Sequence, residues 1–397
     1  MRAFLLPLCL FTTLSANTAI AKEIDFAACV GDIRQQALSQ GITEQTLVST
    51  LDQAKQRPKV VQLDKSQPEF LSTFEDYYTK RVNDWRTNKG RELLAKHRDF
   101  LRELTHRYGV PGPYLIAFWG LETNYGNYKG NIPTLDALST LACEPRRKTF
   151  FTRELLTVLD IIQTQQLDVS TLKGSWAGAM GHTQFMPSTY AQYAIDGDGD
   201  GLIDLFNSER DALASAANFL HQLGWQAGYR WGREILLPEN FDYRLADKNQ
   251  RHPLSFWRKQ GVQTVFGHPL PDIDLEAAVI VPSGYRGPVF LAYHNFRVIM
   301  RWNNSQSYAI AVGKLAEQIN HAPGIVTEFP ANVKIRMVEA KALQRALKDR
   351  GYNISGVDGI IGSKTRAAIR AFQLDQGLIA DGFAHPEVFA ALGIERS

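Results

Sequence analysis

The feature that most constrains this sequence is a short apolar helix with one carboxylate near its end. Pro111-Gly112-Pro113 is a helix-start signal, and Asn124-Tyr125-Gly126 is a stop signal in which Gly126 can adopt a left-handed cap. Four residues between them follow at i, i+3, i+4 and i+7: Leu115, Phe118, Trp119 and Glu122. Because this spacing puts them on one face, we expect Glu122 to share a buried stripe with aromatic side chains.

Apolar neighbours are expected to change the acid–base properties of Glu122. A carboxyl group that loses hydration disfavours its charged form, so its pKa rises toward the range needed for acid–base catalysis at neutral pH. The alternative is a structural glutamate that pairs with an arginine or caps a turn, because perturbed acids are often structural. The periodicity by itself leaves both interpretations open.

The N-terminus has the pattern of an export signal. Arg2 supplies the positive charge, residues 4–14 are largely apolar, and Ala19-Ile20-Ala21 is typical of a cleavage site. The apolar run is shorter than the roughly 20 residues of a spanning helix, and it contains no lipobox. We expect residues 1–21 to be a signal peptide and the mature chain to be soluble and to start near Lys22. A retained anchor is the alternative.

The length of the chain indicates how many domains it can form, and its net charge bears on whether it binds nucleic acid. A chain of 397 residues is long enough for two or three folded units. A net charge of +3 from 44 basic and 41 acidic residues gives no support for binding of nucleic acid. Removal of the leader would leave Cys29 and Cys143, which could form one disulfide in an oxidising compartment or remain as two thiols.

Composition changes along the chain mark its organisation. Residues 226–300 carry prolines and β-branched runs such as Val279-Ile280-Val281, which predict short strands. A helix is expected over Tyr308–Asn320, followed by the turn-rich residues 321–330. The segment before residue 107 has a helical pattern, and residues 108–225 concentrate glycines, aromatic residues and isolated polar residues.

Several ordered motifs resemble those of one family, the lytic murein transglycosylases of the membrane-bound B type. The matching stretches are FWGLETNYG at 118–126, GSWAGAMGHTQFMPS at 174–188, DALASAANFL at 211–220 and RWNNS at 301–305. The resemblance covers roughly residues 25–320. It implies a mainly α (α+β) protein with a lysozyme-like helical catalytic domain and a small β-containing subdomain.

A second resemblance concerns the C-terminal segment. Its ordered series runs from Leu343-Gln344 through Val357-Asp358-Gly359 and Phe372-Gln373 to Asp381-Gly382, and it is similar to the small three-helix peptidoglycan-binding domain of many wall enzymes. Ser363 is expected to cap a helix whose residues Thr365, Ile369 and Phe372 face inward. The predicted domain limits are 1–21 for the signal peptide, 22–325 for the catalytic domain, 326–334 for the linker and 335–397 for the binding domain.

The family resemblance implies a set of site residues. Glu122 is the catalytic acid and base. Positions implied to bind the glycan are Ser175, Gln184, Asn303, Phe150, Phe185, Met186, Trp302 and Tyr308. Aromatic platforms and a few amides suit the apolar faces and hydroxyl rims of sugars. For Phe150 and Trp302, core packing is the alternative. Gly174, Gly178 and Gly181 are expected to let the backbone approach a ligand closely.

The reaction implied by the resemblance needs one carboxylate, whereas most glycoside hydrolases use two. Glu122 would protonate the bridging oxygen between N-acetylmuramic acid and N-acetylglucosamine, and the C6 hydroxyl of the same muramic acid would then attack C1. The product is a 1,6-anhydromuramyl end, formed without water or a cofactor. A hydrolytic muramidase and a noncatalytic wall-binding protein remain as alternatives.

The expected setting is the periplasm, where the substrate would be the glycan strands of peptidoglycan. Proteins of cell-wall synthesis or of the divisome are the further partners considered. The chain is expected to act as a monomer and to bind no nucleic acid.

An acidic loop suggests a structural calcium ion. Asp196, Asp198 and Asp200 occupy the first, third and fifth positions of an EF-hand-like pattern, and Leu202 is at the seventh. The twelfth position is Asn207 rather than the usual glutamate, and the resemblance points to Asp211 as the closing acid. A solvated Asp-Gly turn is the alternative.

Overall fold

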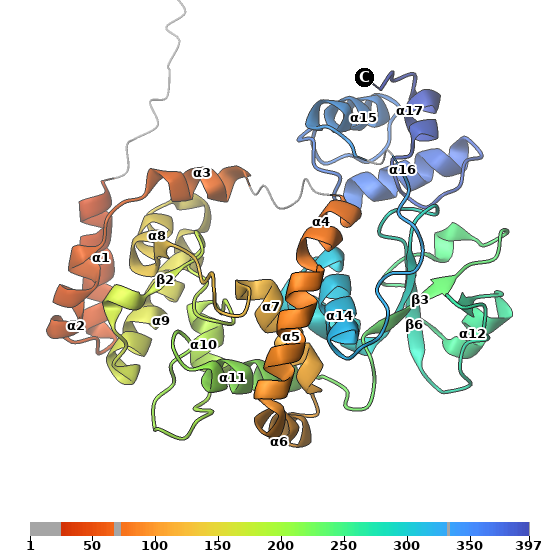
Figure 1. Cartoon of the computed structure of the whole chain (residues 1–397). Helices are drawn as coiled ribbons and strands as arrows, with labels where there is room; N and C mark the ends of the chain where they lie inside the picture. Colours follow the sequence, from red (N-terminus) through yellow and green to blue (C-terminus); the bar gives the residue numbers. More distant parts are fainter. Residues whose placement is uncertain (1–24, 67–72, 332–333, 397) are drawn as a thin grey trace, which may run out of the picture.

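The computed structural model describes residues 25–66, 73–331 and 334–396, so the expected signal peptide and the mature start at Lys22 lie outside the described residues. The fold is mainly helical with one five-stranded sheet, as the sequence predicts (Figure 1). Among the described residues, no helix combines the length and the apolar character needed to cross a bilayer.

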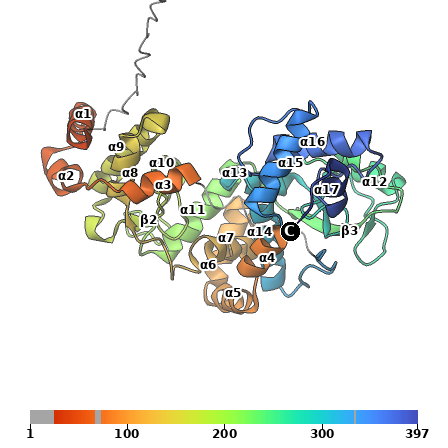
Figure 2. The same cartoon turned by 90° about the horizontal axis from the view of Figure 1, so that it is seen from above.

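A helical lobe forms one end of the molecule, and the β subdomain forms the other (Figures 1 and 2). The helices of the lobe are α1 (Phe26–Ser39), α2 (Glu44–Ser49), α3 (Pro58–Ser66), α8 (Thr134–Ala142), α9 (Lys148–Gln165) and α10 (Pro187–Tyr193). Polar side chains start several of these helices. Asp25 accepts a hydrogen bond from the Ala28 amide, and Thr43 accepts one from the Thr46 amide.

The central layer consists of helices around α7 (Gly112–Thr123). The others are α4 (Phe74–Arg81), α5 (Asp84–Lys96), α6 (Arg98–Tyr108), α11 (Glu209–Gln222), α13 (His294–Trp302) and α14 (Gln306–Ile319). All residues of α7 except Pro113 and Glu122 are buried. A helix that is apolar on every side must lie inside the protein, which accounts for this central position.

The β subdomain contains an antiparallel sheet with strand order β4-β6-β7-β3-β5. Its elements are β3 (Gly232–Leu236), β4 (His252–Pro253), α12 (Leu254–Lys259), β5 (Gln263–Thr264), β6 (Glu276–Ile280) and β7 (Val289–Ala292). Val279 and Leu291 face a local core with Trp257, whereas Ile280 and Phe290 join the main helical core. Both faces are therefore covered, which explains the continuous apolar run in β6.

A short two-stranded ladder lies elsewhere, in the helical lobe. It pairs β1 (Ile132–Pro133) with β2 (Lys173–Gly174).

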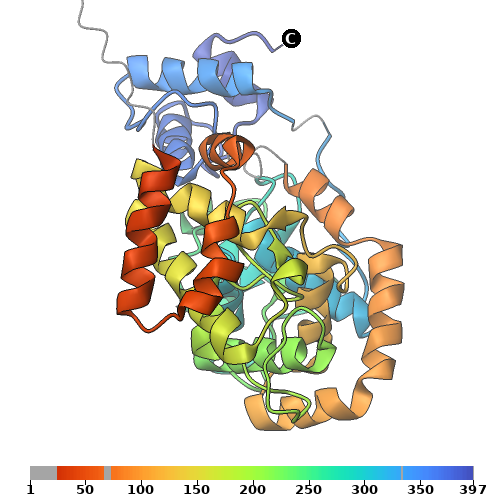
Figure 3. The same cartoon turned by 90° about the vertical axis from the view of Figure 1, so that its left-hand side faces the viewer.

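The C-terminal domain is a bundle of three helices, α15 (Met337–Asp349), α16 (Ser363–Asp375) and α17 (Pro386–Leu392). Thr365, Ile369 and Phe372 are buried as predicted. The prediction for Ser363 is wrong, because the N-cap residue is Gly362 and Ser363 begins the helix without a capping bond. Figure 3 shows this domain, in blue, above the α1 and α2 helices in that view.

The predicted linker lies against the catalytic unit over its first residues. The Glu234 carboxylate on β3 accepts hydrogen bonds from the amides of Val326 (2.9 Å) and Thr327 (2.8 Å). The ring of Phe329 lies 5.8 Å from that of Phe74. This part of the linker is therefore ordered by the surface that it crosses, and residues 332–333 lie outside the described chain.

The C-terminal domain also contacts the β subdomain. The Asp381 carboxylate accepts a hydrogen bond from the Tyr285 amide at 2.9 Å and from His385 Nε2 at 2.6 Å. Arg286 pairs with Glu387 beside this contact. These bonds hold the domain in a defined orientation relative to the sheet.

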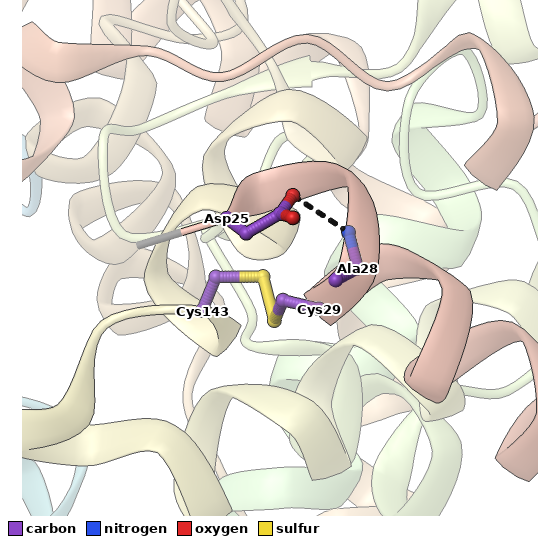
Figure 4. The surroundings of a disulfide bond; sticks show 4 residues. All are labelled: Asp25, Ala28, Cys29 and Cys143. Carbon is purple, nitrogen blue, oxygen red and sulfur yellow. Dashed lines mark hydrogen bonds between the residues drawn. A yellow bond between two sulfur atoms is a disulfide. The ribbon is translucent and has the colours of Figure 1, made fainter. Parts of the chain in front are cut away.

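One disulfide joins two helices of the helical lobe. Cys29 on α1 is bonded to Cys143, which caps the C-terminus of α8, with a Cα–Cα distance of 5.9 Å (Figure 4). The structure thus resolves the choice between a bridge and two free thiols. The bond closes a loop with a sequence separation of 114 residues.

Replacement of both cysteines by serine is expected to destabilise the lobe. In the chain-entropy model a loop of this length contributes about 4–5 kcal/mol to the free energy of unfolding. Urea unfolding followed by circular dichroism should show a lower midpoint for the double variant. Dithiothreitol should lower the midpoint of the wild type and leave that of the variant unchanged. Equal midpoints for the two oxidised proteins would contradict a stabilising role.

Candidate active site

The C-terminal end of α7 is shaped by a left-handed chain reversal. Asn124, Tyr125 and Gly126 all have positive φ angles of 50°, 60° and 81°. The Tyr125 ring then folds back over Gly120, where an added Cβ would lie 2.7 Å from the ring. Glycine at position 120 is therefore required for this reversal, which begins directly after Glu122 and Thr123.

Two arginines satisfy carbonyl groups at this helix end. The buried Arg86 donates from Nε to the Gly120 carbonyl at 3.0 Å and also binds the Asn124 side chain. Arg81 donates to the Leu121 carbonyl at 3.2 Å. Positive charge at a helix C-terminus offsets the negative end of the helix dipole, so these contacts stabilise the last turn around Glu122.

The Glu122 side chain is half-buried and perturbed. Burial raises the pKa of its carboxyl to about 7, whereas a hydrogen bond from Tyr308, the charge of Arg81 and a hydrogen bond from Trp302 lower it in part. Tyr308 Oη donates to Glu122 Oε1 at 2.5 Å. A carboxyl with this pKa is partly protonated at neutral pH, so it can both release and accept a proton.

Aromatic residues surround this acid. Trp302, the last residue of α13, has its ring 4.4 Å from Phe118 on α7 and 5.2 Å from Phe185. Trp302 keeps a partly exposed surface, whereas only 2% of Phe185 is exposed. Phe185 therefore supports Trp302 from inside the core, and it offers almost no surface of its own to a ligand. Tyr308 is also buried, and its hydroxyl is committed to Glu122.

The loop at 174–186 presents the predicted polar residues. Ser175 Oγ accepts hydrogen bonds from the amides of Ala177 and Ala179, which leaves its proton available for donation. Gln184 has a positive φ of 50°, and its Nε2 donates to the carbonyls of Lys129 and Gly181 at 3.0 Å each. The backbone of this loop thus orients both side chains. Met186, two residues after Gln184, is partly exposed.

The glycines of this loop are needed for packing within the protein. An added Cβ at Gly174 would lie 2.1 Å from the Ala179 carbonyl oxygen, and one at Gly181 would lie 2.5 Å from the Leu205 carbonyl oxygen. At Gly178 the obstacle is the Leu138 side chain at 2.3 Å. These close approaches are made within the protein, and the approach of a ligand to the same backbone stays a prediction.

Phe150 and Asn303, two further predicted site residues, lie at the surface. Phe150 on α9 is 37% exposed, and its ring contacts Phe151 and the Arg153 guanidinium. Asn303 is the exposed C-cap residue of α13, directly after Trp302. Both side chains remain available to a ligand, which disfavours core packing as the reason for Phe150.

A polar layer behind α7, which the sequence motifs did not reveal, joins the helix to the loop. Trp119 Nε1 donates to His182 Nδ1 at 2.9 Å, and Thr123 Oγ1 donates to the His182 carbonyl at 3.0 Å. Burial, together with the nearby charge of Lys129, lowers the pKa of His182 to about 4, so the ring is neutral at neutral pH and can accept at Nδ1. In the sequence, the single indication of this layer is His182, which directly follows the loop residue Gly181.

The acidic loop brings together part of the predicted metal set. Among the described residues, Asp196, Asp198 and Asp211 have carboxylate oxygens within 4.8 Å of one another. Asp200 is not part of this cluster, and its carboxylate accepts a hydrogen bond from the Leu202 amide at 2.8 Å. Carboxylate oxygens are ligands that calcium prefers, so the chemistry of the three remaining acids fits this ion.

The chain matches two family models. Residues 25–317 match the family described as transglycosylase SLT domain, and residues 336–392 match a family of peptidoglycan binding domains. Among curated proteins, the chain is 32% identical over 294 residues to membrane-bound lytic murein transglycosylase B of Escherichia coli (strain K12). This match covers 70% of the chain and 79% of the relative.

Solved structures show the same similarity over a longer span. SltB3 of Pseudomonas aeruginosa, solved in complex with NAG-anhNAM-pentapeptide, is 44% identical with a TM-score of 0.88, and the match covers 93% of this chain and 99% of SltB3. The Escherichia coli Slt35 structure in complex with calcium is 30% identical with a TM-score of 0.66, covering 75% of this chain and 95% of Slt35.

Removal of the Tyr308 hydroxyl is expected to raise the pKa of Glu122 above about 7. The hydrogen bond favours the ionised carboxylate, so Tyr308→Phe should shift the titration upward by about one unit. Carbon-detected NMR of labelled glutamate, assigned with Glu122→Gln, measures this value. As a control, Tyr190→Phe removes a hydroxyl that binds the distant Ile203 carbonyl, and it should leave the titration unchanged. A lower pKa in Tyr308→Phe would contradict the assigned geometry.

Proposed function

The chain belongs to the transglycosylase SLT domain family and is a lytic transglycosylase of peptidoglycan, and we propose that Glu122 is its single acid–base catalyst. The observation that carries the proposal is the half-buried Glu122 carboxyl, with a pKa of about 7 and a hydrogen bond from Tyr308. Within the part of the chain that the structure describes, no second acid affects the pKa of Glu122, and its charged neighbour is Arg81. One group must then donate a proton and later accept one.

The proposed reaction cleaves the β-1,4 bond from N-acetylmuramic acid to N-acetylglucosamine. Protonated Glu122 gives its proton to the bridging oxygen as the bond to C1 breaks. The ionised Glu122 then accepts the proton of the muramic C6 hydroxyl, whose oxygen bonds to C1. The acid is regenerated and no water is consumed. An intramolecular nucleophile benefits from its high effective concentration. The anhydro ligand in the SltB3 complex supports this product class.

The surrounding side chains have separate proposed tasks. Tyr308 and Trp302 hold the carboxylate by hydrogen bonds that favour its ionised form, which assists proton donation in the first half of the reaction. Ser175, Gln184 and Asn303 are proposed to bind hydroxyl and acetamido groups of the sugars. Phe150, Met186 and Trp302 offer apolar surface to the sugar rings, with Phe185 beneath Trp302.

We also propose export to the periplasm by cleavage of residues 1–21. The Cys29–Cys143 bridge supports this location, because disulfides persist in oxidising compartments. The docked C-terminal domain is proposed to bind peptidoglycan and to raise the local concentration of substrate at the catalytic unit. Contacts with wall-synthesis or divisome proteins, and action as a monomer, complete the proposal.

Replacement of Glu122 by glutamine is expected to abolish cleavage of purified sacculi. The amide keeps the shape of the side chain but cannot supply the proton, and loss of a general acid typically costs about 10²–10⁴ in rate. Release of soluble fragments from sacculi measures the loss. Glu239→Gln, which changes an exposed glutamate in the β subdomain, is the matched control and should retain full activity. Parental activity in Glu122→Gln would refute the assignment.

The mass of the products separates transglycosylation from hydrolysis. Anhydro ends lack one water relative to the reducing ends that a muramidase would release. Mass spectrometry of wild-type digests should therefore find anhydro ends, and hydrated ends would favour the muramidase alternative. Complete absence of turnover would favour a noncatalytic wall-binding protein.

We propose that the acidic loop binds one structural calcium ion that takes no part in the chemistry. Burial raises the pKa of Asp211, so its ionised form would gain from a nearby cation. Two backbone amides, those of Gly197 and Asp204, already orient this carboxylate. The calcium complex of Slt35 is the related precedent.

Chelation is expected to lower the melting temperature, and added calcium to restore it. A ligand at about 100 times its Kd stabilises the folded state by about 2.7 kcal/mol, which corresponds to a shift of several degrees. Differential scanning calorimetry with EDTA and then excess calcium measures the effect. Asp196→Asn/Asp198→Asn should lose the response, while the exposed Asp274→Asn should keep it. An unchanged wild-type transition under both conditions would exclude the ion.

A further inference from the structure

A cavity of about 530 Å³ lies at the opposite end of α7 from Glu122. It opens to solvent and is lined by residues of α5, α6, the start of α7 and the end of α14, together with His321. Its volume is within the range of roughly 300–1,000 Å³ that is typical of sites for small ligands. Gly112 and Pro113 line it, ten residues before Glu122, which corresponds to roughly 15 Å along a helix. The cavity is therefore separate from the catalytic centre.

Its lining is rich in basic groups and contains no acidic residue. The basic and imidazole side chains are Arg91, Arg98, Arg102, His106 and His321. Arg102 pairs with Asp99, but the two side chains are 75% and 87% exposed, so this pair neutralises little charge. In the described part of the chain, no carboxylate pairs with Arg91 or Arg98.

Arg91 is held in place while part of its guanidinium remains unused. Its Nη2 donates to the Gln318 carbonyl at 2.8 Å, and Nη1 donates to Asn88 at 3.3 Å. Its Nε is buried and has no hydrogen-bond partner among the described residues. The two anchored Nη groups keep the positive charge of the Arg91 guanidinium at the wall of the cavity.

Apart from Thr105 and Gly112, the rest of the lining is apolar. A small inorganic ion would leave this apolar surface without a partner. Leu94, Ala95, Leu101, Pro113 and Ile319 form this surface. A suitable ligand thus combines carboxylates with short aliphatic groups. A second cavity of about 460 Å³ shares Pro113 with the first, and its lining includes Arg230 and Arg233 together with the acidic Glu317.

We propose that this basic pocket binds a short acidic peptide, namely the stem peptide that a peptidoglycan strand carries. The inference rests on the proposed substrate, since a stem peptide provides carboxylates and small apolar side chains in one chain. The pocket would hold the peptide while α7, a single buried helix, keeps a fixed distance between this contact and Glu122. Peptide-bearing glycan would then be held at two points, which increases its residence on the enzyme.

The test is calorimetric titration of the full chain with a free stem pentapeptide. Arg98→Gln and Arg102→Gln should each weaken binding about five- to tenfold, which is the loss expected for one charge-assisted contact. Arg107→Gln changes an exposed arginine on the same helix that does not line the pocket, and it should bind the peptide like the wild type. The same pentapeptide with its carboxylates amidated should not bind.

Two outcomes would overturn the proposal. The first is peptide binding that is unchanged in the Arg98→Gln/Arg102→Gln double variant. The second is inorganic phosphate that binds as tightly as the peptide and displaces it, which would indicate a site for any anion. Because free peptide is bound and not cleaved, these results are independent of whether Glu122→Gln loses activity.

Discussion

The structure depends on one constraint, the burial of a carboxyl group at the end of an apolar helix. Glu122 loses hydration because nearly all of α7 is buried, and its pKa rises to about 7 for that reason. Tyr308 and Trp302 limit the rise by stabilising the ionised form. The balance keeps both protonation states accessible near neutral pH, which is what a single group needs to act first as an acid and then as a base.

This balance requires that α7 and its surroundings remain rigid. Arg86 and Arg81 satisfy carbonyls of the last turn, and the Tyr125 ring folds over Gly120. Behind the helix, Trp119 and Thr123 bond to His182, which connects the acid to the loop that presents Ser175 and Gln184. Small changes in any of these contacts would alter the solvation of Glu122, so residues that never touch the substrate also set its proton affinity.

The proposed substrate contacts are spread over the molecule and not confined to the catalytic carboxyl. The C-terminal domain is oriented by the Asp381–Tyr285 contact and by the ordered part of the linker, so it is not a loosely tethered unit. The basic pocket at the start of α7 would add a contact for the peptide part of the wall. A polymer held at several weak sites stays bound longer than one held at a single site, since release requires all contacts to break together.

The sequence by itself determined features with a local physical cause. The period of α7, its start at the prolines, its end at the asparagine, the strand around Val279 and the inward face of α16 all follow from neighbours within a few residues. The family motifs also named Tyr308 and Trp302, which the structure places in hydrogen-bond contact with Glu122. Only the tertiary structure decided the contacts between distant segments. The Cys29–Cys143 pairing, the bond from Tyr308, the protein-packed glycines and the exclusion of Asp200 from the acidic cluster depend on chain packing, which no local pattern encodes.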